Sequence, residues 1–60
     1  MKFEQLANKQ IGVSDDGVDI GIMGYSHQYN EWRFSTIYMN AFTSKQLKKV
    51  SKKLRELNNV

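Results

Sequence analysis

Residues 42–57 constrain the fold of this chain most, because they carry both a helix start signal and a helical apolar period. Thr43 and Gln46 match the T-x-x-Q capping box, in which each side chain accepts a hydrogen bond from the other residue's backbone N–H. An apolar stripe at helical spacing follows the cap and consists of Leu47, Val50, Leu54 and Leu57. We therefore expect an amphipathic helix over residues 43–58, with this stripe packed against a core.

The opposite side of the expected helix is cationic. It carries Lys45, Lys48, Lys49, Lys52, Lys53 and Arg55. Residues 42–60 hold six cations and one carboxylate, whereas residues 1–41 hold three cations and five carboxylates, so the net charge of +3 comes from the helix. A surface of this kind can neutralise phosphates. It is also the ordinary solvated side of a helix, and the sequence leaves both interpretations open.

The chain length and the missing cysteines limit how the fold can be stabilised. A chain of 60 residues forms one small domain with little buried surface. It has no cysteine and one histidine, which excludes disulfides and any zinc site built on cysteines. We therefore expect a homodimer, in which a second copy supplies buried surface.

Residues 11–39 alternate between apolar and polar positions and predict three strands. The turn cluster Ser14-Asp15-Asp16-Gly17 predicts a tight β-hairpin with strands over 11–14 and 17–24, and a third strand covers 32–39. Residues 1–10 fit either a helical turn or an edge strand, and we expect a short helical or irregular lead-in. The predicted fold is α+β, a three-stranded antiparallel β-meander with one C-terminal amphipathic helix packed on one face.

The predicted strands place apolar side chains on both faces of the sheet. Strict alternation puts Val18, Ile20 and Ile22 beneath the helix, and Met23 with Tyr25 on the other face. Large apolar side chains on a face that no helix covers favour a contact surface, and a β-bulge that switches the strand face is the less favoured alternative. The residues expected at a partner or dimer interface are Trp32, Tyr38 and Met23.

Two non-catalytic functions fit this pattern. The first is nucleic-acid binding, single-stranded or non-specific, in which the six helix cations act together with Arg33 and the aromatic side chains Tyr25 and Tyr29. The second is a small protein-interaction or inhibitor protein of phage or mobile-element origin, which binds a host protein through the uncovered sheet face. Steep salt dependence distinguishes the first function from the second.

The order of elements near the C-terminus suggests a family. A strand ending in Ile37-Tyr38-Met39, the Thr43-x-x-Gln46 cap, and a helix with Leu47 and Leu54 together resemble the C-terminal half of positive-cofactor-type coactivators and their bacterial relatives. The resemblance implies a dimeric single-strand DNA-binding protein with a curved sheet and one helix. The predicted strands lack the basic residues that such sheets carry, apart from Arg33, and we do not assign the chain to this family.

The sequence contains no motif that predicts catalysis. His27 follows Ser26 in a polar loop, without the strand–turn–helix support of a catalytic triad, and the Asp15–Asp16–Asp19 spacing does not match a calcium loop. We expect no enzyme activity, no cofactor, no metal and no small-molecule substrate. No stretch is apolar enough for a membrane span or a signal peptide, so we expect a cytoplasmic protein.

Overall fold

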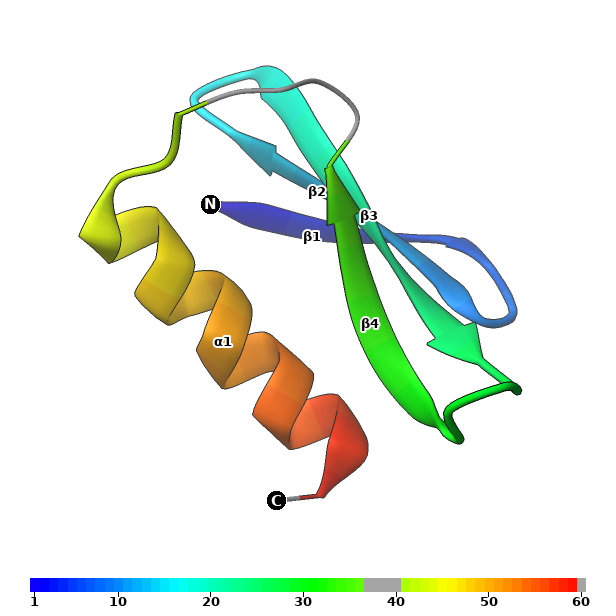
Figure 1. The fold of residues 1–60 in the computed structure, drawn as a ribbon. Coiled ribbons are helices and arrows are strands. Elements are labelled where there is room, and N and C mark those ends of the chain that lie inside the picture. Colours follow the sequence, from blue (N-terminus) through cyan, green and yellow to red (C-terminus); the bar gives the residue numbers. More distant parts are fainter. Residues whose placement is uncertain (37–40, 60) are drawn as a thin grey trace.

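The computed structural model describes residues 1–36 and 41–59, and these form one antiparallel sheet and one helix (Figure 1). The strands lie side by side in chain order and are β1 (Lys2–Ala7), β2 (Gln10–Asp15), β3 (Val18–Ser26) and β4 (Glu31–Thr36). The helix α1 (Ser44–Asn58) follows them and covers one face of the sheet. The predicted α+β class is confirmed, but the described residues contain four strands where three were expected.

The additional strand is β1, so the expected helical or irregular lead-in is wrong. Phe3 pairs with Val13, and Gln5 pairs with Ile11. A helix of so few residues is marginal in water, whereas pairing with β2 satisfies the backbone groups of the same segment. The sequence of β1 fits both periods, and the neighbouring strand decides between them.

The tight hairpin expected from the sequence forms between β2 and β3, and its turn consists of two residues. Asp16 and Gly17 both have positive φ, at 53° and 79°. Positive φ at both central residues defines the type I′ turn, whose twist matches that of the flanking strands. The last predicted strand, over 32–39, begins as β4, while its residues 37–39 lie outside the described residues.

The pairing between β2 and β3 shifts by one residue at Ile20. Val13 lies opposite Gly21, but Ser14 lies opposite Asp19, so Ile20 has no partner position. An extra residue of this kind is a β-bulge, and it reverses the alternation of side chains along the strand.

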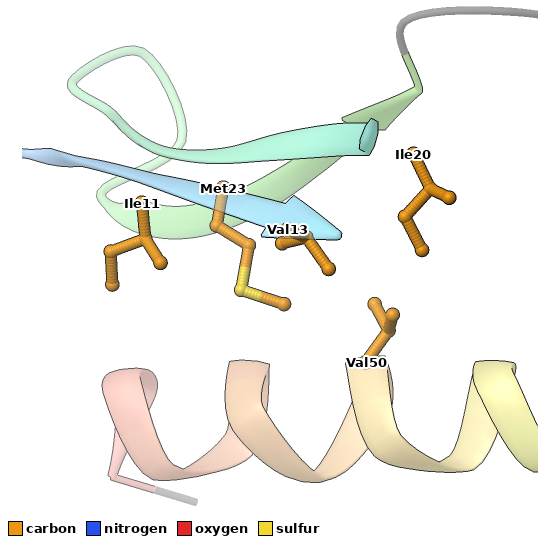
Figure 2. Close-up of a cluster of buried hydrophobic side chains, with 5 residues drawn as sticks. All are labelled: Ile11, Val13, Ile20, Met23 and Val50. Atoms are coloured by element: carbon orange, nitrogen blue, oxygen red, sulfur yellow. The ribbon is translucent and has the colours of Figure 1, made fainter. Parts of the chain in front are cut away.

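This bulge overturns the predicted faces of β3. Ile20 is 5% exposed and Met23 is fully buried, and both side chains point toward α1 (Figure 2). Val18, opposite Asp15, lies on the same side of the sheet as Ile20 but is 58% exposed, whereas Ile22, adjacent to Met23, lies on the opposite face. The prediction that Ile22 lies beneath the helix, with Met23 and Tyr25 on the uncovered face, is therefore wrong. Val18 lies on the predicted side, but α1 does not cover it. The alternative explanation by a bulge is confirmed.

Gly21 follows the bulge and allows a close approach between β3 and β4. A Cβ atom at this position would lie 2.5 Å from both the Phe34 ring and the Ser35 carbonyl oxygen. A glycine in the middle of a strand commonly marks a bulge or a close backbone approach of this kind.

The core lies between the sheet and α1. Its buried side chains are Ile11, Val13, Ile20, Met23 and Val50 (Figure 2). Half-buried apolar side chains surround them, namely Met1, Phe3, Trp32, Phe34, Phe42, Leu54 and Leu57. Leu47 is 52% exposed, so the predicted packing of the apolar stripe holds for its other members but is wrong for Leu47.

Candidate functional site

The N-terminal end of α1 is fixed by the predicted capping box. The Thr43 backbone N–H donates to Gln46 Oε1 over 2.9 Å, and the Gln46 N–H donates to Thr43 Oγ1 over 3.1 Å. Gln46 Nε2 also donates to Asp15 Oδ2 at 2.8 Å, which ties the cap to β2. This hydrogen bond, together with the N-terminal ammonium 3.3 Å from Asp15 Oδ1, lowers the pKa of the Asp15 carboxyl.

The C-terminal end of α1 is fixed to the edge of the sheet. The Trp32 backbone N–H donates to Asn58 Oδ1 at 2.7 Å, and Asn58 Nδ2 donates to the Trp32 carbonyl oxygen at 3.1 Å. The Asn58 amide therefore pairs with β4 as the peptide group of a further strand would. Since both ends are tied to the sheet, α1 holds its solvent side in one orientation.

That solvent side is a cationic surface, which we call the lysine face. Its exposed members are Lys45, Lys48, Lys49, Lys52 and Arg55. The ion pairs found among the described residues involve other groups, so none of these five cations is neutralised by a carboxylate there. Neighbours on a helix surface lie about 5–6 Å apart at three- and four-residue spacing, and the lysine face therefore presents a dense row of positive charge.

A groove runs between the lysine face and β1. It has a volume of about 300 Å³ and is lined by Met1, Phe3, Lys49, Lys52, Lys53 and Glu56. The apolar lining comes from the sheet and most of the charged lining comes from the helix. The groove therefore joins an aromatic ring to the cationic surface within one concave site.

Lys53 connects the two sides of this groove. It is half-buried, unlike the other helix cations, and its Nζ lies 5.6 Å from the centroid of the Phe3 ring. This distance is near the outer limit of about 6 Å for a cation–π contact, so the ring holds the ammonium weakly.

Tyr25 belongs to a separate cluster at the loop end of the sheet. Its ring packs edge-on against Trp32 and His27, with centroid distances of 6.2 Å and 5.2 Å. Lys9 Nζ lies 4.4 Å from the Tyr25 centroid. Tyr25 is thus half-buried beside a cation, on the side of the sheet that faces α1.

Tyr29 and Arg33 are on the other side of the molecule from the lysine face. The Arg33 guanidinium lies 3.4 Å from the Tyr29 centroid, and its Nε lies 2.8 Å from Glu31 Oε2. Arg33 pairs with Gly24 on the sheet face turned away from α1. The structure therefore does not bring Arg33 and Tyr29 together with the helix cations.

Of the residues expected at a partner interface, Met23 and Trp32 lie on the side of the sheet that faces α1. Met23 is fully buried in the core, so its predicted place at an interface is wrong, because the bulge turns it toward α1. Trp32 packs against the core on the same side, and Tyr38 lies outside the described residues. The face turned away from α1 instead carries mainly polar or small side chains, with Leu6 and Ile22 as its large apolar members.

Sequence reasoning missed Phe3 and Lys9. Phe3 reaches the groove because β1 is a strand. The placement of Phe3 and Gln5 at alternate positions was the sequence signal that could have indicated this strand. No local pattern indicates that Lys9 lies against Tyr25, because strand pairing brings these two residues together.

Comparisons with protein-family models, with curated proteins and with solved structures found no match. In the part of the chain that the structure describes, no cluster of three or more His, Cys, Asp or Glu side chains could hold a metal ion. Within residues 1–36 and 41–59, no helix has the length and hydrophobicity needed to cross a membrane.

Proposed function

We propose that this protein binds nucleic acid without catalysis, through the lysine face of α1. The observation that carries the proposal is the set of five exposed cations, free of carboxylate partners among the described residues, on a helix fixed at both ends. Binding through such a surface follows from the release of counterions from the phosphate backbone and requires no particular base sequence.

The length of the lysine face along the helix axis sets the expected number of phosphate contacts. Lys45 and Arg55 are ten positions apart, which corresponds to about 15 Å along the helix axis. If four of the cations each neutralise one phosphate, log Kobs falls with log salt with a slope of about −3 on a single strand.

Fluorescence anisotropy with labelled single-stranded and duplex oligonucleotides tests this proposal. Lys48→Gln and Lys52→Gln should each reduce the magnitude of the salt slope by up to about 1. Lys2→Gln is the matched control, because it removes one charge from the face turned away from α1 and should leave the slope unchanged. No binding by the unmodified protein at low salt would refute the proposal.

The proposal excludes Arg33 and Tyr29 and keeps Tyr25 as a peripheral contact. Arg33 is already paired with Glu31 on the opposite face, whereas Tyr25 and Lys9 lie on the side of the sheet that faces α1.

The protein-interaction alternative required large apolar side chains on the uncovered face. The inward orientation of Met23 and Tyr25 weakens that support and leaves Leu6 and Ile22 as the large apolar side chains of this face.

We also propose that the protein forms a homodimer. In support, the core contains five buried side chains among residues 1–36 and 41–59, and Leu6, Val18 and Leu47 are each more than half exposed. A core of this size barely offsets the conformational entropy of ordering the chain. Light scattering should give twice the monomer mass, and the melting temperature should rise with protein concentration. A monomer mass with a concentration-independent melting temperature would contradict the dimer.

A further inference from the structure

We propose that the groove between α1 and β1 takes an unpaired nucleic-acid base against Phe3, while the neighbouring phosphates bind Lys49, Lys52 and Lys53. This inference rests on the proposed function and narrows its ligand from nucleic acid in general to unpaired strands. It is carried by the position of one aromatic ring among the cations of the lysine face.

The groove has the two components that an unpaired nucleotide needs. Phe3 provides an aromatic wall, since the Met1 side chain is only 1% exposed, and the three lysines provide positive charge within the same volume of about 300 Å³. A base has an apolar face that stacks on aromatic rings, and its phosphate requires a cation. A duplex keeps its bases stacked inside and presents mainly phosphates, so it would use the cations but not the ring.

Lys53 is the residue that exchanges partners in this proposal. Its ammonium lies 5.6 Å from the Phe3 centroid and makes no ion pair among the described residues. A base stacking on Phe3 displaces the ammonium, which then reaches the adjacent phosphate on its flexible side chain. Phe3 thus exchanges a weak cation–π contact for stacking on a base. The Lys53 ammonium exchanges the same weak contact for an ion pair with a phosphate.

Glu56 limits where the phosphates can lie. Its carboxylate lines the same groove as the three lysines and repels a phosphate placed next to it. The bound nucleic-acid strand is therefore expected to pass the groove with its phosphates toward Lys49 and Lys52, on the N-terminal side of Glu56.

The decisive experiment compares two single strands of equal length with the unmodified protein. One is a thymine oligonucleotide, and the other is an abasic oligonucleotide with the same phosphates and no bases. Stacking of one base predicts that the thymine strand binds about 5- to 100-fold more tightly. Equal affinity for the two strands would overturn this inference and leave phosphate binding intact.

Substitution of Phe3 gives an independent test. Phe3→Leu keeps an apolar side chain at the position but removes the ring, and should weaken thymine-strand binding by about fivefold or more. Duplex binding by the same variant is the internal control and should not change. An equal loss for both ligands, or no loss for either, would overturn the inference, and a thermal melt would show that the variant is folded.

The failure of this inference and the failure of the proposed function give different results. If no oligonucleotide binds at low salt, the proposed function is wrong and the base site falls with it. If thymine, abasic and duplex ligands bind alike, the proposed function stands and the base site alone is wrong.

Discussion

The two long sides of α1 meet the sheet in different ways. On the β4 side, the Asn58 amide binds the Trp32 backbone, and Phe42 packs edge-on against Phe34 with a centroid distance of 6.3 Å. On the β1 side, an open groove separates the helix lysines from Phe3. One side is closed by specific contacts and stabilises the fold, whereas the other leaves an aromatic ring and cations accessible to a ligand.

The difference between the β4 side and the β1 side of α1 implies that folding stability and ligand binding can be changed by separate substitutions. The closed side includes an edge strand whose backbone groups at Trp32 are occupied by Asn58, and this protects β4 from pairing with another strand. The open side gains little stability from its lysines, since exposed charged side chains contribute little to folding. The following predictions test this division, beginning with the largest expected effect.

Truncation in the closed interior should be the most damaging change. Met23 is fully buried, so Met23→Ala should lower the free energy of unfolding by about 2–5 kcal/mol. Phe3→Leu, at the open groove, should cost less than about 1.5 kcal/mol, because it replaces one apolar side chain by another of similar volume. Chemical denaturation of both variants measures the difference. Equal losses would mean that β1 is as much a part of the interior as β3.

Removal of the Asn58 amide should open the closed side. Asn58→Ala leaves the half-buried Trp32 N–H and carbonyl without their partner and should cost about 1–3 kcal/mol. Ser51→Ala, at an exposed position of the same helix, is the control and should change stability by less than about 0.5 kcal/mol. The freed edge of β4 should also promote self-association, measurable by light scattering. Unchanged stability of Asn58→Ala would show that this contact does not close the β4 side.

Loss of the N-cap should destabilise α1 as a whole, with equal effect on its β4 side and its β1 side. Thr43→Ala removes the hydroxyl that accepts the Gln46 N–H and should cost about 1 kcal/mol. Thr43→Ser retains a hydroxyl and should recover most of this loss. Thermal melts followed by circular dichroism give both values, and a neutral Thr43→Ala would place the stabilising cap elsewhere.

The hydrogen bond from Gln46 to Asp15 should make stability depend on pH in the acid range. It is the largest cause of the lowered pKa of Asp15, so the folded state favours the carboxylate. The contribution is fully present above the pKa of an unfolded aspartate, about 3.9, and is lost as the pH falls through the lower folded pKa. Asp15→Asn should reduce this acid sensitivity in melts between neutral pH and about pH 2, with Asp19→Asn as the control. The same acid dependence in Asp15→Asn and the parent protein would exclude Asp15 as its source.

Local signals in the sequence determined the helix, one hairpin and the α+β class. The capping box begins α1 where the sequence predicts, because its hydrogen bonds join residues three positions apart. The Asp16–Gly17 turn forms as expected, because it depends on the backbone freedom of two adjacent residues. The cations of the lysine face could also be identified, since helical spacing alone places them opposite the apolar stripe.

Only the tertiary structure decided which side chains meet. β1 becomes a strand because β2 supplies its hydrogen-bond partners, and the bulge at Ile20 sends Met23 into the core against strict alternation. The groove at Phe3 exists because that strand lies beside the helix, although more than forty residues separate Phe3 from Lys49. Register, strand face and groove depend on long-range pairing and packing, and no residue specifies these through its immediate neighbours in the chain.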